Sequence, residues 1–226
     1  MKLSGKQVGL VTCLGALAVY WVIESFFGGR EIALIIGEPW DHMRDRSSAR
    51  IGAAPPGVMW GFSPKTDARL RFIDPTYGFV TPIADFFIIA FDNQKVESVV
   101  IRPQTKLLLL DDALGVVVDL QKQWQAKGWS PLYPIDNPPI ADSQEWRTKI
   151  RGFSKGATTY WQAGDKYHAS LSIHCSNIKE FPAEERCQIT LNVAKAWMQR
   201  REEHENAKAQ TFVCDERCLQ KLKEKL

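Results

Sequence analysis

Cys214 and Cys218 are the two residues of this chain whose spacing most resembles that of a metal or redox site. If their segment is helical, the CxxxC spacing places both thiols one turn apart on one face. Such a pair can bind a soft metal such as copper or take part in redox chemistry, with His204 as a further ligand. The alternative is a local disulfide that holds the end of the chain. Because no cluster of Met or His accompanies the motif, we predict a disulfide here and no metal site.

Two further groups of polar residues have side chains suited to chemistry. Asp41 and Asp45, with His42, could act as an acid–base pair or bind a divalent cation, but such residues more often cap a helix in solvent. His168 and His174 lie on the polar face of one expected strand, roughly 20 Å apart at about 3.3 Å per residue. They therefore cannot bind one metal ion together.

Ser176 and Lys179 have the SxxK spacing of acylating serine enzymes, but they lie in an expected loop without the companion motifs of that class. The chain also lacks GxSxG, HExxH, Walker A and GxGxxG motifs. We predict no catalytic residue, no cofactor and no metal. A catalytic triad scattered along the sequence leaves no local motif, so an unrecognised enzyme stays among the hypotheses below.

Cys175 and Cys187 are expected to form a disulfide, because the segments that carry them alternate in hydrophobicity. Every second residue is apolar in 167–175 and again in 187–193. If these strands are antiparallel neighbours, the two cysteines lie at matching ends of the buried face. Their bond would close a short loop and stabilise the fold by about 2–3 kcal/mol. With the CxxxC pair they make an even set, which suits an oxidising compartment.

The start of the chain predicts a membrane anchor. An uncharged apolar run extends from Val8 to Ile23 and continues to Phe27. At about 1.5 Å per residue, a helix of this length crosses the hydrocarbon core of a bilayer. Lys2 and Lys6 precede the run, and the positive-inside rule keeps them in the cytoplasm. The rest of the chain is then expected in the periplasm, on the far side of a bacterial inner membrane.

Two other interpretations of this segment stay open. Residues 16–18 (Ala-Leu-Ala) resemble a signal-peptidase site, although cleavage there leaves an apolar new N-terminus. Cys13 resembles a lipoprotein cysteine, but Thr12 stands where that signal needs a small residue. A retained anchor, a cleaved signal and a lipidated cysteine all place the folded part outside the cytoplasm.

The composition is that of a globular protein and argues against a nucleic-acid partner. The 226 residues are 45% hydrophobic and 24% charged, with a formal net charge of +3. No stripe of Lys and Arg alternates with aromatic residues, so this weak charge does not indicate nucleic-acid binding. The eight Trp residues fit either a core or a partner-binding surface.

The order of the segments predicts an α+β fold. Residues 1–29 hold the cytoplasmic start and anchor, 30–57 a membrane-proximal segment, 58–198 the α+β periplasmic domain and 199–226 a charged helical tail. Four prolines near 130–140 predict a split of the domain into two β-rich halves. We expect an N-terminal transmembrane helix followed by antiparallel hairpins and a meander with packed helices.

A hairpin and the helix after it are the clearest local elements. Strands are expected at 85–91 and 96–101 around an Asp-Asn turn. Asp111 or Asp112 is expected to cap a helix that runs to about Lys127, with Gly128 at its C-terminal end. Its expected inward stripe is Ala113, Leu114, Val117, Val118 and Trp124, whereas Gln121, Lys122 and Lys127 are expected to face water. The order strand, strand, helix predicts that this helix lies across its own hairpin.

Shorter elements are expected on either side of this unit. The patterns predict strands at 31–36, 58–62 and 68–73, helices at 40–48 and 143–151, and a three-stranded meander over 158–193.

One stretch of the sequence resembles a known class of proteins. It consists of a hairpin with the centre DNxxVxSVxI, at 92–101, followed by LDDAL at 110–114 and a helix that ends in Gly128-Trp129. This pattern is similar to envelope-anchored immunity proteins of type VI secretion systems, which neutralise periplasm-acting toxins. The resemblance covers about a fifth of the chain. It implies a protein partner, a secreted toxin, and assigns no residues.

Three hypotheses about function follow. The first is a membrane-anchored inhibitor or immunity protein that binds a periplasm-acting toxin. The second is a structural subunit of an envelope assembly such as a secretion complex, which the anchor and the mixed-charge C-terminal segment would fit. The third is an unrecognised enzyme or a metal carrier that uses the CxxxC motif.

Overall fold

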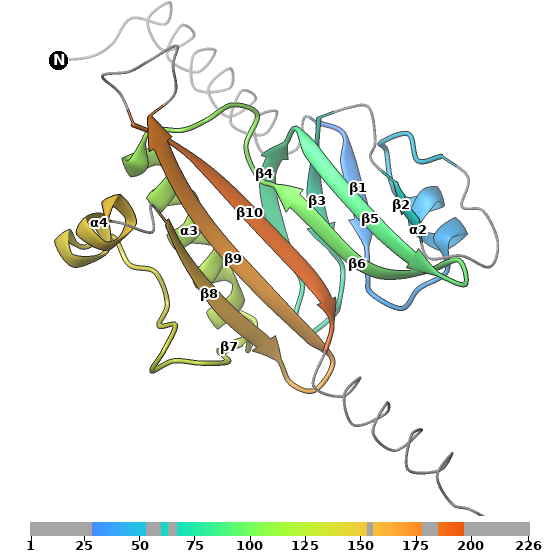
Figure 1. Cartoon of the computed structure of the whole chain (residues 1–226). Helices are drawn as coiled ribbons and strands as arrows, with labels where there is room; N and C mark the ends of the chain where they lie inside the picture. Colours follow the sequence, from blue (N-terminus) through green and yellow to red (C-terminus); the bar gives the residue numbers. More distant parts are fainter. Residues whose placement is uncertain (1–28, 53–59, 63–66, 153–155, 178–184, 197–226) are drawn as a thin grey trace, which may run out of the picture.

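The computed structural model describes residues 29–52, 60–62, 67–152, 156–177 and 185–196, and its strands form two β-sheets (Figure 1). The smaller sheet has the order β1-β3-β4, and the larger one has the order β2-β5-β6-β10-β9-β8-β7. The fold is therefore α+β, and every strand pair of the larger sheet is antiparallel. The strands are β1 (Glu31–Leu34), β2 (Trp60–Phe62), β3 (Ala68–Phe72), β4 (Phe79–Ala84), β5 (Phe86–Asp92), β6 (Lys95–Arg102), β7 (Ser130–Pro131), β8 (Gly156–Ala163), β9 (Tyr167–Asn177) and β10 (Glu185–Lys195).

The described helices are α2, α3 and α4, and each agrees with an expected segment. They span α2 (Trp40–Arg46), α3 (Leu110–Ala126) and α4 (Gln144–Arg151). The Ser143 side chain caps α4 by accepting the Trp146 N–H (3.3 Å). None of the helices among the described residues is long and apolar enough to cross a membrane. The predicted anchor, including Val8, Ile23 and Phe27, lies outside the described residues.

The β5–β6 hairpin and the β8–β9–β10 meander confirm the strand predictions. Asn93 and Gln94 both have positive φ at the hairpin turn, as two-residue turns between twisted strands require. In the meander, β9 and β10 are paired over their whole length with Cys175 opposite Cys187. Their sulfurs are bonded at 1.96 Å, so the disulfide expected from the strand pattern is confirmed.

One continuous sheet joins strands from both sides of the proline-containing stretch near 130–140. β6 precedes that stretch and β10 follows it, yet Ile101 pairs with Leu191 and Val99 pairs with Val193. The hairpin and the meander therefore share one hydrogen-bonded ladder. Their inward residues belong to one hydrophobic core.

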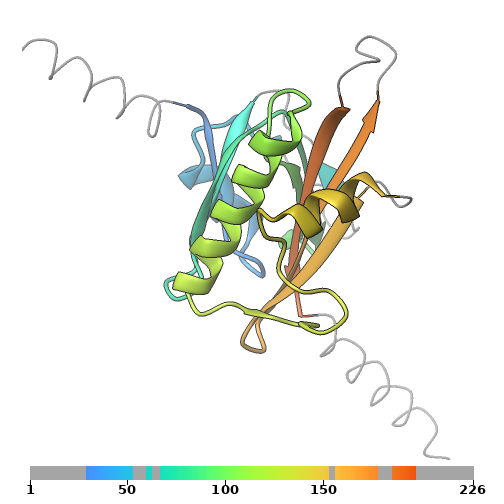
Figure 2. The ribbon, with the colours of Figure 1, turned by 90° about the vertical axis from the view of Figure 1, so that its left-hand side faces the viewer.

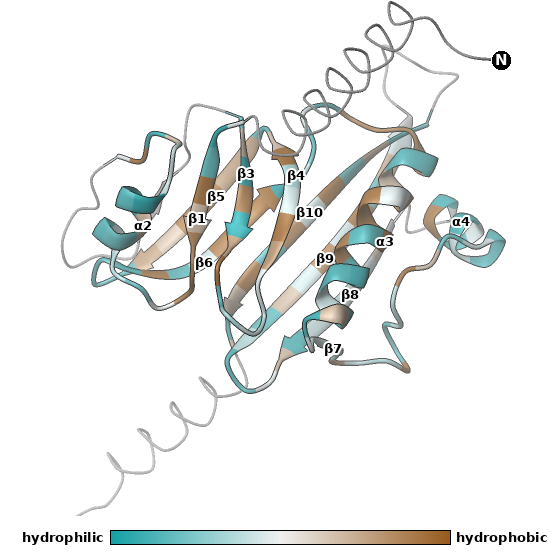
Figure 3. Cartoon of the chain, turned by 180° about the vertical axis from the view of Figure 1, so that it is seen from behind, coloured by the Kyte–Doolittle hydropathy of each residue, from teal (hydrophilic) through white to brown (hydrophobic). Residues whose placement is uncertain are grey.

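The predicted position of α3 across its own hairpin is wrong. α3 packs against β10 and β9, with β4 at its side. Figure 3 shows β1, β3 and β4 in front of the hairpin, side by side with α3 on the same face of the larger sheet. The smaller sheet thus occupies the face on which the helix was expected, and α3 covers the meander instead.

Two details of α3 also differ from expectation. The helix begins at Leu110, so Asp111 and Asp112 lie in its first turn and cap no N–H group with their side chains. In the first turn, their negative charges interact favourably with the positive end of the helix dipole. Asp111 also forms an ion pair with Arg147 of α4. Gln121 is buried rather than solvated, and Val118 of the expected inward stripe is only half-buried.

Candidate binding groove between β4 and α3

The positions of β4 and α3 are fixed at one end by a cluster of aromatic rings. Trp129 is 3% exposed and lies at its centre. Its ring centroid is 5.6 Å from Trp124, 6.0 Å from Phe79 and 6.1 Å from Tyr77. We call the six rings the aromatic junction: Phe72, Tyr77, Phe79, Trp124, Trp129 and Tyr167.

The C-terminal end of α3 aims Trp129 into the aromatic junction. Gly128 has φ +79°, and its N–H donates to the Gln125 carbonyl (3.1 Å). The Trp129 N–H donates to the Trp124 carbonyl (3.0 Å), and the two indole rings stack. This is the Schellman arrangement with its hydrophobic contact, so the predicted glycine end of the helix is confirmed.

The turn between β3 and β4 is held by the buried carboxylate of Asp74. Its Oδ1 accepts the N–H groups of Thr76 and Tyr77, each at 2.9 Å. Its Oδ2 accepts the Tyr167 hydroxyl at 3.0 Å, and Lys166 Nζ lies 3.8 Å away. The turn is therefore bound directly to the β8–β9 region of the other sheet.

Burial and hydrogen bonding act in opposite directions on Asp74. Burial by itself raises the pKa of this carboxyl group, but the hydrogen bonds from Tyr77 and Thr76 oppose it. With the Tyr167 hydroxyl and the Lys166 charge added, the net pKa of Asp74 is below the ordinary value of an aspartate. Burial and the Asp74 charge raise the pKa of Tyr167, so its hydroxyl stays protonated and donates to Asp74.

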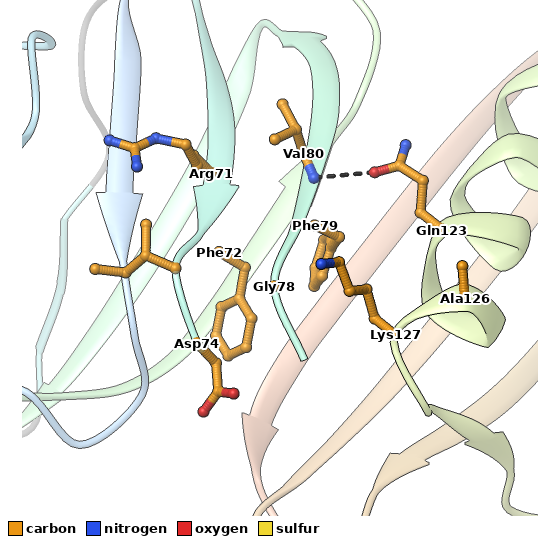
Figure 4. A pocket seen from close by; sticks show the side chains of 10 residues that line it. Arg71, Phe72, Asp74, Gly78, Phe79, Val80, Gln123, Ala126 and Lys127 are labelled. Carbon is orange, nitrogen blue, oxygen red and sulfur yellow. Dashed lines mark hydrogen bonds between the residues drawn. The ribbon is translucent and has the colours of Figure 1, made fainter. Parts of the chain in front are cut away.

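Beyond the aromatic junction, β4 and α3 separate and leave two open depressions. The first has a volume of about 470 Å³ and lies between Arg71, Phe79 and Lys127 (Figure 4). The second has a volume of about 670 Å³ and extends to Pro103 and Lys106. Val80 and Gln123 line both depressions, so we treat them as one surface, the β4–α3 groove.

The groove is closed to pairing with another strand. β4 is an edge strand, and its Val80 N–H donates to Gln123 Oε1 (3.1 Å). Pro82, two residues further along the same edge, has no N–H, and its carbonyl accepts the Thr81 hydroxyl (2.9 Å). A ligand in the groove would therefore be recognised through its side chains rather than by extending the sheet.

The opposite edge of the same sheet is closed in a similar way. On β1, the Glu31 N–H donates to Ser48 Oγ (2.8 Å) and the Ala33 N–H donates to Ser47 Oγ (3.0 Å). The Glu31 carbonyl accepts the Ala49 N–H (3.1 Å).

The rim of the groove has an excess of positive charge. The lining residues include four basic side chains, Arg69, Arg71, Lys106 and Lys127, of which Arg71 is ion-paired with Glu31 of β1 (2.7 Å), and two acidic ones, Asp74 and Asp119. Asp74 is buried and accepts three hydrogen bonds. Between these charges lie apolar side chains from three segments, namely Val80, Pro82, Ile83, Pro103, Leu108 and Val116. The groove therefore suits aliphatic side chains flanked by carboxylates.

The described part of the chain does not gather its sequence candidates for chemistry into one site. Asp41, His42 and Asp45 are exposed on α2, and Asp45 forms an ion pair with Arg44. Among the described residues, no group of three or more His, Cys, Asp or Glu is arranged to hold a metal ion.

The two strand histidines lie at separate positions on β9. His168 pairs with Gln162 and His174 with Gly156 of β8. His174 is exposed as expected, but His168 is 3% exposed, and this burial lowers its pKa.

Four residues considered for chemistry lie outside the described part of the chain. These are Lys179, His204, Cys214 and Cys218.

Sequence patterns did not indicate the groove. Gln123 is one of several polar residues in the helical segment and Lys106 lies in a loop, so neither residue stands out in the sequence. A signal for Asp74 was present in the sequence Asp-Pro-Thr-Tyr-Gly at 74–78, because Asp and Pro start turns and Gly ends them. At Gly78 a Cβ atom would lie 2.7 Å from the Asp74 carbonyl oxygen, so the turn excludes larger residues.

Neither a protein-family model, nor a curated protein, nor a solved structure matches this chain.

Proposed function

We propose that this chain is a membrane-anchored periplasmic protein-binding module, and that it is an inhibitor or immunity protein against a periplasm-acting toxin. The observation that carries the binding role is the β4–α3 groove, with its apolar floor and basic rim. Its occupant is a segment of the partner protein with aliphatic side chains and neighbouring carboxylates.

The shape of the groove supports a protein ligand. Protein interfaces concentrate their binding energy in a few anchor side chains that fill pockets, surrounded by polar contacts. The two depressions share Val80 and Gln123 and can accept two such anchors from one segment. Val80 is also 36% exposed, which leaves apolar surface ready for contact.

The disulfide supports the proposed location. Cys175 and Cys187 form an intrachain bond, and such bonds persist mainly in oxidising compartments. The apolar run from Val8 to Phe27 supplies the anchor in this proposal.

The resemblance to immunity proteins supports the toxin as the partner. The residues that carry it form β5, β6 and α3. α3 contributes Val116, Asp119 and Gln123 to the wall of the groove, so part of the resembling segment lies at the proposed binding surface.

The test is affinity purification of the tagged full-length chain from its own host in mild detergent, read by mass spectrometry. We expect one stoichiometric exported partner that carries a hydrolase motif. The variant Val80→Glu should reduce its recovery at least about 10-fold, because a carboxylate would lie against an apolar floor. The matched control is Ile88→Glu on β5, since Ile88 is similarly exposed at 39% but lies away from the groove.

Equal recovery with both variants would exclude the groove as the binding surface. Co-purification of a set of integral membrane proteins would instead support the structural-subunit hypothesis. If the partner is a toxin, cells with the wild-type chain should survive its export to the periplasm and cells with Val80→Glu should not. Loss of viability in both strains would reject the immunity role.

A further inference from the structure

The segment between α3 and α4 displays the most exposed large apolar side chain among the described residues. Ile135 is 92% exposed, and Tyr133 is 40% exposed. Isolated apolar side chains are common on protein surfaces. Here, however, two of them flank Pro134 in one loop, residues 132–137, which we call the display loop.

The chain on both sides of the display loop is fixed to the core. After the loop, the buried side chain of Gln121 accepts the Ile140 N–H (2.9 Å) and donates to the Ile140 carbonyl (2.6 Å). At its first residue, the Leu132 N–H donates to the Tyr160 carbonyl of β8 (2.8 Å). The burial of Gln121, which the helical pattern did not predict, is thus explained by its role as a clamp on this segment.

The display loop is also braced internally. The Asn137 N–H donates to the Tyr133 carbonyl (2.8 Å), which closes a turn around Ile135. The Tyr133 ring packs edge-on against Tyr160, with centroids 5.8 Å apart. Because the loop conformation is fixed before any contact forms, ordering it on binding costs little entropy.

Asp136, the residue after Ile135, carries a negative charge, and its side chain is exposed. No Lys or Arg occurs between Lys127 and Arg147. A complementary site would therefore be an apolar pocket with basic residues at its rim.

We propose that the display loop is a second protein-docking element, in which Ile135 inserts into an apolar, basic-rimmed pocket of an exported partner protein. The loop lies beside β8, whereas β4 lies on the other side of α3 (Figure 2). The two surfaces are opposite in charge and are built from different segments, so each can be tested without the other.

The test is photocrosslinking of the full-length chain in its own host. The photoreactive residue p-benzoylphenylalanine replaces Ile135 in one variant. In a second variant it replaces Ile88, on an unrelated exposed surface, and in a third it replaces Val80, in the β4–α3 groove. We expect one adduct of defined mass from position 135 and none from position 88. Asp136→Lys should abolish the adduct from 135 and leave any adduct from 80 unchanged, because only the loop contact depends on that charge.

Each outcome decides between the two surfaces. If an adduct forms from position 80 and none forms from position 135, docking by the display loop is rejected and binding in the groove is supported. If an adduct forms from position 135 and none forms from position 80, binding in the groove is rejected. No adduct from either position rejects both. An adduct from 135 that persists with Asp136→Lys, or that also forms from 88, reflects nonspecific contact and rejects the loop.

A quantitative check follows once the crosslinked protein is purified. Ile135→Ala should weaken its binding about 10-fold or more, as expected when an anchor side chain is truncated. An unchanged dissociation constant would overturn the proposal. The thermal stability of Ile135→Ala should equal that of the wild type, because the side chain makes little contact with its own chain.

Discussion

The aromatic junction and the β4–α3 groove lie between the same strand and the same helix, yet they differ in packing. At Phe79 and Trp124 the two elements are joined by rings with centroids 5.6 Å apart. One residue further along β4, Val80 borders both open depressions. The Gln123 side chain spans the boundary by its bond to the Val80 N–H.

Phe72 and Phe79 belong to both regions, because they pack in the aromatic junction and also line the first depression, whereas no residue of the aromatic junction lines the second depression. The aromatic junction fixes the angle at which β4 and α3 diverge, so the groove has a definite shape without packing of its own. Substitutions in the aromatic junction should therefore lower stability, whereas substitutions of exposed groove residues outside it, such as Val80 and Lys106, should affect binding with little change in stability. The predictions below test that separation, from the largest expected effect to the smallest.

Trp129→Ala should have the largest effect. Its ring packs against five others in the aromatic junction, and removal of a buried Trp side chain costs about 3–5 kcal/mol. We expect a corresponding fall in the free energy of unfolding, measured by urea titration. Val80→Ala, just inside the groove, is the control and should change that free energy by less than about 0.5 kcal/mol. Similar losses for both variants would show that the groove is part of the folding core.

Tyr167→Phe should have the next largest effect. It keeps the ring but leaves Asp74 Oδ2 without the buried hydroxyl at 3.0 Å. A buried charged acceptor that loses its partner costs about 1–3 kcal/mol. The same substitution at Tyr133, an exposed ring outside the aromatic junction, should be nearly neutral. If Tyr167→Phe were as stable as the wild type, the polar contact would not be needed to hold the turn.

Lowering the pH should reduce the stability of the fold through Asp74, whose carboxylate holds the turn beside the aromatic junction. Because its pKa is lower in the folded state than in the unfolded chain, the unfolded state takes up the proton first. The stabilisation is fully present above the ordinary aspartate pKa, about 3.9, and is lost as the pH falls through the folded-state pKa. Thermal unfolding from pH 6 down to pH 2.5 should show this loss in the wild type.

Asp74→Asn provides the comparison for the acid effect. It should be less stable than the wild type at pH 6, and the gap should narrow as the pH falls, since the variant has no charge to lose at this position. A gap that stays constant across the range would show that the Asp74 charge does not contribute.

Gly115, within α3, and Gly128, just after its end, should respond to substitution by Ala in opposite directions. Gly128→Ala places a side chain at φ +79° and should destabilise by about 1 kcal/mol, since this conformation disfavours a Cβ atom. Gly115→Ala lies in the helix with open space around it and should stabilise by about 0.5–1 kcal/mol. Thermal melts of the two variants measure both effects. Changes of the same sign would mean that α3 ends differently from the arrangement described.

Lys106→Glu should have the smallest effect on stability and a large one on binding. The exposed side chain borders the groove, so its replacement should change the free energy of unfolding by less than about 0.5 kcal/mol. Reversing its charge should weaken capture of an acidic partner segment. Unchanged capture would show that the basic rim does not select the ligand.

Local elements were predictable because local patterns determine them. Alternation in 167–175 and 187–193 predicted the meander and the position of its disulfide, and Gly128 marked the end of α3. The placement of α3 was not predictable, because it depends on β1 pairing with β3 in parallel and on the sheet they form with β4. Such pairings join distant segments and leave no local period.

The groove escaped prediction for a related reason. Its residues come from β3, β4, the loop after β6, and α3, and most of them look like ordinary surface positions. The role of Gln123 depends on a strand 43 residues earlier in the chain. Polar helix residues are normally solvated, so the same pattern that located the helix assigned Gln121 to the wrong environment.

The closed edges of the small sheet have a consequence for the behaviour of the protein at high concentration. Unpaired strand edges recruit strands from other copies and start aggregation. The N–H groups of Glu31, Ala33 and Val80 are hydrogen-bonded within the chain, and Pro82 has no N–H group. These positions on β1 and β4 are therefore closed to pairing with a strand of another copy. Solutions of the folded protein should stay clear on prolonged storage, and variants that reopen an edge, such as Gln123→Ala, should be the first to become turbid.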